Sequence, residues 1–263
     1  MRDSLLLLRE GPVARVRMDR PQLHNAFDAD LIAGLTGVFD ELGRDPAVRV
    51  VILEGAGPSF SAGADLNWMR GMAAASEADN REDSLKLARL MRTLDELPKP
   101  TIARVHGAAF GGGVGLVACC DIAIATRNAT FGLTEARLGL LPAVISPYVI
   151  AAIGARQARR WFATAERFDA AQAHRIGLVH ILVDDDAALD AAVMQQSEFL
   201  LHAGPIAAAT AKSLVRRVAD AGDARSIDEA NAALIAALRV SPEGQEGLAA
   251  FLGKRRPTWT TES

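Results

Sequence analysis

Three consecutive glycines, Gly111 to Gly113, constrain this chain more than any other feature of its sequence. They stand between an apolar run with strand character, Thr101–Val105, and an apolar run with helix character, Val114–Ala118. Glycines at such a junction leave backbone N–H groups uncovered, and the start of a helix points those groups toward a ligand. The turn is therefore predicted to hold a developing negative charge.

One acidic residue, Glu135, follows this turn in an otherwise apolar neighbourhood. Apolar surroundings disfavour the ionised form of a carboxyl group and so tune its pKa for proton transfer. A turn that stabilises an anion, combined with one such carboxylate, indicates chemistry on a carbonyl group.

A second turn, Ser61–Leu66, has the same physical character as the first. Each turn follows an apolar strand, is rich in Gly and Ala, and precedes a predicted helix. Paired N–H donors from two separate turns are what an oxyanion hole requires. Taken singly, each turn is more often a tight turn packed in the core. The glycine run alone also fits phosphate binding, but no Gly-Lys-Ser/Thr follows it and the dinucleotide-binding spacing is absent.

The overall composition excludes several classes of function. The chain has 263 residues, of which 50% are hydrophobic and 23% charged, and its net charge is −3. This balance is that of a globular enzyme with a substantial core and argues against disorder. A mildly acidic chain without a Lys/Arg tract predicts no nucleic-acid partner. Its apolar stretches are interrupted before a membrane-spanning length, so no membrane partner is expected.

Metal binding and disulfide formation are also not expected. The two cysteines, Cys119 and Cys120, are adjacent in the chain, and a bond between neighbours is strained. They are predicted to be buried thiols in a reducing compartment, which favours the cytoplasm. With no second cysteine cluster and five dispersed histidines, a zinc site is not predicted.

The order of the predicted elements indicates an α/β fold. Strands at 48–53 and 101–105 alternate with a helix capped by Asp28 and another that starts near Asp83. Beyond about residue 186 the chain is Ala-rich and helical throughout. Strand–helix alternation followed by helices alone predicts a core over residues 1–186 and a helical subdomain over 187–263.

Seven ordered motifs resemble the enoyl-CoA hydratase/isomerase (crotonase) superfamily and cover most of residues 13–183. The motifs are Arg20–Phe27, Ser59–Leu66, Lys99–Ala103, His106–Gly113, Cys120–Ala125, Phe131–Gly139 and Ala171–Val179. The resemblance implies a spiral of ββα units with a C-terminal helical region. That region would serve in trimerisation and cover the active site, in a homotrimer or in a hexamer built from two trimers.

The resemblance also implies the ligand and the residues that hold it. The substrate would be an acyl-CoA thioester, with coenzyme A as part of the substrate and no separate cofactor. Its carbonyl oxygen would accept hydrogen bonds from the N–H groups of Ala64 and Gly112. The loops around His24 and Ala26, and from Ala62 through Asp65 to Leu66, would wrap the CoA moiety. Asp65 fits the N-cap of a helix equally well.

The acid–base residues leave the reaction open. Hydratases of this superfamily typically use two glutamates; Glu135 matches the second, whereas the first would fall at Gly115. A lone glutamate at the second position also occurs in Δ3,Δ2-enoyl-CoA isomerases. We therefore hypothesise hydration of an α,β-unsaturated acyl-CoA with Glu135 as general acid/base. The alternatives are an isomerase and a non-catalytic acyl-CoA-binding protein that retained the fold.

A finer resemblance concerns the acyl group. The segment Leu140–Val149, together with Gly113–Asp121, resembles the methylglutaconyl-CoA and carboxygeranoyl-CoA hydratase-like enzymes of leucine and acyclic-terpene breakdown. Tyr148, the single tyrosine of the chain, is expected near the acyl pocket, where it would donate to a substrate carboxylate or pack in the core. His106, at the end of a predicted strand, is expected to be structural.

Overall fold

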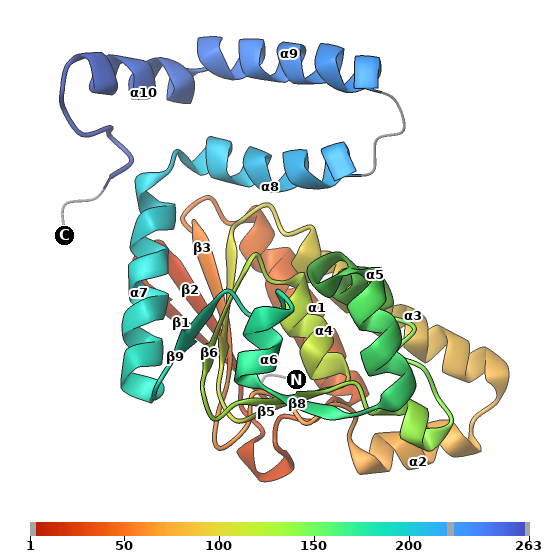
Figure 1. The fold of residues 1–263 in the computed structure, drawn as a ribbon. Helices are drawn as coiled ribbons and strands as arrows, with labels where there is room; N and C mark the ends of the chain where they lie inside the picture. The colour runs from red at the N-terminus through yellow and green to blue at the C-terminus, as the bar shows by residue number, and fades with distance from the viewer. Residues whose placement is uncertain (1–3, 220–223, 261–263) are drawn as a thin grey trace.

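The computed structural model describes residues 4–219 and 224–260, and its centre is a six-stranded sheet (Figure 1). The strand order is β1-β2-β3-β4-β6-β9. β1 and β2 are antiparallel, and every later pair is parallel. The strands are β1 (Leu5–Glu10), β2 (Val13–Met18), β3 (Val50–Gly55), β4 (Thr101–Val105), β6 (Ile122–Thr126) and β9 (Ile181–Val183).

Alternating side chains along the sheet build a separate apolar core on each face. On the inner face, residues such as Leu53 and Val105 join the main core with helices α1 (Ala29–Arg44), α3 (Glu77–Asp95) and α4 (Gly112–Cys119). On the outer face, Ile52 and Ile102 pack with Leu189 and Val193 of α7 (Asp186–His202). Because both faces of β3 are covered, all six of its residues are buried, as expected for a central parallel strand.

A second, three-stranded sheet leads into the glycine run. Its order is β5 (Ala108–Phe110), β7 (Thr130–Gly132) and β8 (Arg167–Asp169). β5 begins within three residues of the end of β4, and α4 begins at Gly112, immediately after the turn. The chain therefore passes from the large sheet into the small one and then directly into a buried helix.

The remaining elements connect these layers or cover them. The 3-10 helices are η1 (Pro21–Leu23) and η2 (Glu135–Leu138). Helices α5 (Ser146–Thr164) and α6 (Ala170–Arg175) add buried residues to the main core. The other α-helices are α2 (Leu66–Ala74), α8 (Pro205–Ala219), α9 (Ala224–Val240) and α10 (Pro242–Leu252). No helix in the described part of the chain is both long and apolar enough to span a membrane.

Helices α8, α9 and α10 extend away from the two sheets (Figure 1). Ion pairs attach α8 to the core, where Lys212 Nζ lies 2.9 Å from Asp121 Oδ2 and Arg216 Nη1 lies 3.3 Å from Glu96 Oε1. Arg49, at the start of β3, donates hydrogen bonds to the carbonyls of Leu201, Ala203 and Trp259 and so fixes the turn between α7 and α8.

The predicted α/β fold is confirmed, and so is the cap of its first helix. The Asp28 carboxylate accepts a hydrogen bond from the Leu31 N–H at 2.8 Å at the start of α1. The predicted start of the next long helix near Asp83 is wrong, because α3 begins at Glu77. Ser76 caps it by accepting from the Asp79 N–H, an N-terminal signal that lies within the polar stretch before Asp83.

Candidate active site

The two glycine turns lie side by side. Ser61 bridges Ala109 of β5: its N–H donates to the Ala108 carbonyl at 3.0 Å, and its carbonyl accepts from the Phe110 N–H at 2.9 Å. A Cβ atom added at Gly63 would lie 3.0 Å from the Phe110 carbonyl oxygen, and one added at Gly113 would lie 2.8 Å from the Ser61 carbonyl oxygen. The turns therefore approach at distances that only glycine permits.

Two backbone N–H groups remain uncommitted at this junction. Ala64 forms a parallel bridge with Phe27, in which the Phe27 N–H donates to the Gly63 carbonyl and its carbonyl accepts from the Asp65 N–H. This pattern uses the groups on either side of Ala64 and leaves its own N–H directed away. Gly112 is the first residue of α4, so its N–H has no acceptor within the helix. Neither N–H has a hydrogen-bond partner among the residues that the structure describes.

Glu135 lies directly against the glycine turn. A Cβ atom on Gly111 would lie 3.1 Å from the Glu135 Oε1 atom, and Gly111 adopts a positive φ of 50°. The other carboxylate oxygen, Oε2, is buried and has no hydrogen-bond partner within the described chain. Burial raises the pKa of Glu135, and the hydrogen bond from its own backbone N–H only partly opposes this effect. The group thus favours the protonated state more than an exposed glutamate does, which suits a general acid/base.

The position expected for a second acid is closed by an apolar side chain. A Cβ atom on Gly115 would lie 2.9 Å from the Cβ of Ile145, closer still to its Cγ2, and 3.3 Å from the Met91 Cε. Gly115 is itself buried within α4. Ile145 therefore fills the volume that a side chain at position 115 would need, and the wall beside the glycine turn is apolar.

The residues predicted to contact CoA belong to two loops that pack together. The Ala62 N–H donates to the His24 carbonyl at 2.9 Å, and Arg20 Nη1 donates to the Ala26 carbonyl at 2.8 Å. The His24 Nδ1 atom lies 2.9 Å from the Ser59 Oγ. These contacts bring the 24–28 loop alongside the second glycine turn.

Asp65 and Leu66 lie where that turn enters α2. Asp65 is the N-cap of α2, and its Oδ1 accepts from the Asn67 and Trp68 N–H groups at 2.8 and 3.2 Å. Leu66, by contrast, is 70% exposed at the start of the helix. The carboxylate of Asp65 is therefore occupied by the helix, whereas the Leu66 side chain is free to contact a ligand.

Tyr148 lies in the first turn of α5. Burial, together with the neighbouring Cys119 and Asp95, raises the pKa of its hydroxyl to about 12. The hydroxyl forms no hydrogen bond within the described chain, and no hydrogen bond joins the side chain to Glu135. The side chain packs against the main core, next to groups of α3 and α4.

Sequence reasoning did not single out Asn25, a positioning residue at the junction of the two loops. It is fully buried, with φ at 53°. Its Nδ2 donates to the carbonyls of Ala56 and Ser59 at 2.9 and 2.8 Å, and its Oδ1 accepts from the Arg20 N–H at 2.9 Å. Its place in the Arg20–Phe27 motif was a signal of importance, but its acceptors lie more than 30 residues away.

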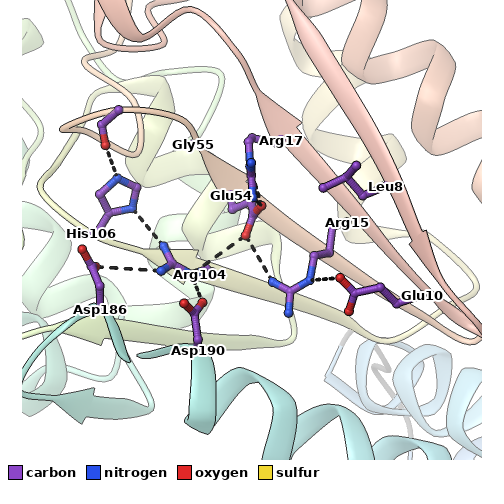
Figure 2. Close-up of a pocket in the computed structure, with 11 residues that line it drawn as sticks. Leu8, Glu10, Arg15, Arg17, Glu54, Gly55, Arg104, His106, Asp186 and Asp190 are labelled. Carbon is purple, nitrogen blue, oxygen red and sulfur yellow. Dashed lines mark hydrogen bonds and ion pairs between the residues drawn. The ribbon is translucent and has the colours of Figure 1, made fainter. Parts of the chain in front are cut away.

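The outer face of the sheet has a polar hollow of about 400 Å³ (Figure 2). Its charges are paired with one another: Arg17 Nε lies 2.7 Å from the buried Glu54 Oε1, and Arg104 Nε lies 2.6 Å from the Asp190 Oδ1. A ligand would therefore meet no unpaired charge there. Among the residues described, no three His, Cys, Asp or Glu side chains are placed to bind a metal ion.

The chain is similar to known proteins over almost its whole length. A sequence model described as enoyl-CoA hydratase/isomerase matches residues 9–262. The crystal structure of an enoyl-CoA hydratase from Shewanella pealeana has a TM-score of 0.94 and 45% identity, covering 97% of this chain and 96% of that one. Pseudomonas aeruginosa AtuE has a TM-score of 0.95 and 37% identity, covering 98% and 100%. A crotonyl-CoA hydratase of Syntrophomonas wolfei is 31% identical over 265 residues, 99% of each chain.

Proposed function

Because the chain belongs to the enoyl-CoA hydratase/isomerase family, we propose that it catalyses the reversible hydration of an α,β-unsaturated acyl-CoA. The observation that carries this proposal is the position of Glu135 beside the two turns with uncommitted N–H groups. The similarity to an enoyl-CoA hydratase of Shewanella pealeana and to a crotonyl-CoA hydratase of Syntrophomonas wolfei supports the same reaction class.

In this proposal the turns hold the thioester carbonyl. The N–H groups of Ala64 and Gly112 donate to its oxygen, and both hydrogen bonds strengthen as the oxygen becomes an enolate. Each such donor is worth about 3 kcal/mol in the transition state. Because these donors are fixed in the backbone, they need not reorient as negative charge develops on the oxygen. The two turns therefore lower the activation barrier for enolate formation. The 24–28 loop and the Ala62–Leu66 segment bind the CoA moiety.

Glu135 then carries out both proton transfers of the reaction. In the hydration direction its carboxylate accepts a proton from water as the water oxygen bonds to the β-carbon. The electron pair of the double bond moves onto the thioester oxygen as the enolate forms. The protonated Glu135 next gives its proton to the α-carbon, the enolate collapses, and the 3-hydroxyacyl-CoA is complete. One carboxylate suffices because it ends the cycle ionised, as it began.

Isomerisation is the second candidate, and the packing of Ile145 against Gly115 favours it. With an apolar side chain in place of a second acid at position 115, Glu135 alone would have to activate a reacting water molecule. In that reaction Glu135 removes a proton from the α-carbon of a 3-enoyl-CoA and returns it to the γ-carbon. Water takes no part, and the same two N–H groups stabilise the dienolate.

The acyl group forms the finer part of the proposal. In this finer proposal the Leu140–Val149 segment lines the acyl group, since its Ile145 packs beside the glycine turn. The substrate is then a branched acyl group with a distal carboxylate, such as 3-methylglutaconyl-CoA. Tyr148 has a hydroxyl with no hydrogen bond in the described chain and is the residue offered as its donor.

Assembly into trimers, or into hexamers made of two trimers, is part of the same proposal. The supporting observation is apolar exposure on the helical subdomain of residues 187–263: Val240 is 77% exposed and Phe251 is 80% exposed. Large exposed apolar patches mark surfaces that another chain covers, and we propose that these helices form such a surface. Sedimentation at micromolar concentration checks this assembly, and a monomer would contradict it.

The test is a panel of crotonyl-CoA, longer 2-enoyl-CoAs, 3-methylglutaconyl-CoA and a 3-enoyl-CoA, each incubated in water enriched in oxygen-18. A hydratase yields 3-hydroxyacyl-CoA that carries the label. An isomerase moves the double bond of the 3-enoyl-CoA and incorporates no label. Retained binding with no turnover of any ester would overturn both and leave the acyl-CoA-binding protein as the explanation.

A further inference from the structure

The two segments that carry Ala64 and Gly112 are joined by a ladder of backbone hydrogen bonds. The Phe60 N–H donates to the His106 carbonyl at 3.0 Å, and the Ser61 hydrogen bonds to Ala108 and Phe110 follow. At the far end of this ladder, Gly107 packs so tightly against the Pro58 carbonyl that no Cβ would fit. The relative position of the two N–H groups therefore depends on how these segments are aligned.

The His106 side chain contacts the far end of this ladder from the outer face of the sheet. The His106 ring lies beside Arg104 (Figure 2) and contacts the Gly57 carbonyl. Its Nε2 atom lies 2.7 Å from that oxygen, and its Nδ1 atom lies 3.4 Å from the Arg104 Nη1. A guanidinium can only donate and a carbonyl can only accept. These two contacts fit the tautomer of His106 in which Nε2 donates to Gly57 and Nδ1 accepts from Arg104.

Arg104 is itself held in place. It is 12% exposed and pairs with Asp190 of α7, with the buried Glu54 at 3.9 Å on its other side. Arg104 and Glu54 are register partners on β4 and β3, so the sheet fixes their spacing. The group that contacts Nδ1 thus belongs to a rigid element.

We propose that His106 is a positioning residue for the oxyanion hole, which sets the spacing between the N–H groups of Ala64 and Gly112. The inference rests on the proposed function, since it assigns a role within that site. His106 does not meet the substrate, because its ring lies on the outer face of the sheet. It acts through Gly57, at the start of the loop that leads to the Ser61–Leu66 turn.

The loop before that turn accepts hydrogen bonds from side chains on both of its sides. Asn25 binds the carbonyls of Ala56 and Ser59 from the buried side, and His106 binds the Gly57 carbonyl from the outer side. Hydrogen bonds weaken steeply once they lengthen or bend, and an oxyanion donor must lie about 2.7–3.1 Å from the developing charge. A small shift of this loop would therefore weaken transition-state binding more than it weakens binding of the CoA moiety, which the 24–28 loop also contacts.

The test compares two substitutions of nearly equal size. His106→Gln keeps an N–H donor that reaches Gly57, whereas His106→Met fills the same volume with none. The probe is an enoyl-CoA with a carbon-13 thioester carbonyl, whose infrared stretching band moves to lower frequency when the oxygen accepts strong hydrogen bonds. His202→Gln is the matched control, because His202 Nδ1 lies 2.7 Å from a carbonyl of its own helix, that of Glu198.

We expect His106→Met to lose part of the bound-state band shift and about tenfold in kcat, with KM changed less than about threefold. His106→Gln should recover most of both, and His202→Gln should match the wild type. The inference is overturned if His106→Met and His106→Gln give the same band and the same kcat. It is also overturned if both variants melt at a lower temperature while their infrared band and kcat match those of the wild type. A wild-type protein whose bound ester shows no band shift would instead refute the proposed oxyanion hole.

Discussion

Ile145 packs into the space beside Gly115, so that a Cβ atom at position 115 would lie 2.9 Å from the Cβ of Ile145. The two residues are 30 positions apart, one in α4 and the other immediately before α5. The absence of a second acid is therefore built into the packing of the core, and a glutamate introduced at position 115 alone would have no room.

This packing predicts strong coupling between substitutions at the two positions. Gly115→Ala should destabilise the protein by about 1–3 kcal/mol, because an overpacked core must shift neighbouring side chains. Ile145→Ala should cost about 2–5 kcal/mol through the cavity it leaves. The double variant should be more stable than the sum of the two costs implies, because each change relieves the other. Chemical unfolding of all four proteins measures the coupling, and strict additivity would contradict it.

Glu135→Gln should abolish most of the activity. The amide cannot accept a proton from water or return one to the α-carbon, so kcat should fall by about 10²–10⁴. The CoA-binding loops do not depend on this carboxylate, so the affinity for a CoA ester should be nearly unchanged. Steady-state rates and calorimetric titration with a CoA ester check the two parts. Glu198→Gln, on an exposed face of α7, is the control, and a Glu135→Gln protein that kept most of its hydration rate would refute the assignment.

The pH profile of hydration should have an acid limb above the ordinary glutamate range. Hydration begins with ionised Glu135, and burial raises the pKa of this group above its reference value of 4.5. Activity is therefore lost as the pH falls through the raised pKa, which the pH dependence of kcat/KM reports for the free enzyme. An acid limb at or below 4.5 would show that another group controls the protonation state.

The same pKa shift predicts that Glu135 lowers the stability of the fold at neutral pH. Between the ordinary pKa and the raised one, the folded state binds more protons than the unfolded state, so stability falls as the pH rises through that window. Above the raised pKa the full destabilisation by ionised Glu135 is present, and below the ordinary pKa it is absent. Glu135→Gln should therefore melt no lower than the wild type at pH 7, with no gain at pH 4. Thermal unfolding across this range is the measurement, and a clear loss of melting temperature at pH 7 would contradict the prediction.

Much of the candidate site could be predicted from local sequence. The glycine turns and Glu135 stand out because glycine, helix starts and isolated carboxylates have strong local meanings. The order of seven motifs then indicated the family, and the same motifs placed Ala64 and Gly112 in matching turns. The start of α3 was misjudged because its first turns are too polar to show helical periodicity.

The sequence by itself determined the α/β fold, the family and the one acid beside the glycine turn, because these depend on backbone preferences within short segments. Only the tertiary structure decided that Ile145 occupies the space at Gly115 and that Glu135 Oε2 has no hydrogen-bond partner within the described chain. It also decided that Asn25 and His106 contact one loop from opposite faces. Each of these facts joins segments that the register of the two sheets brings together. Contacts of this kind depend on strand alignment and core packing across the whole chain, which no local pattern encodes.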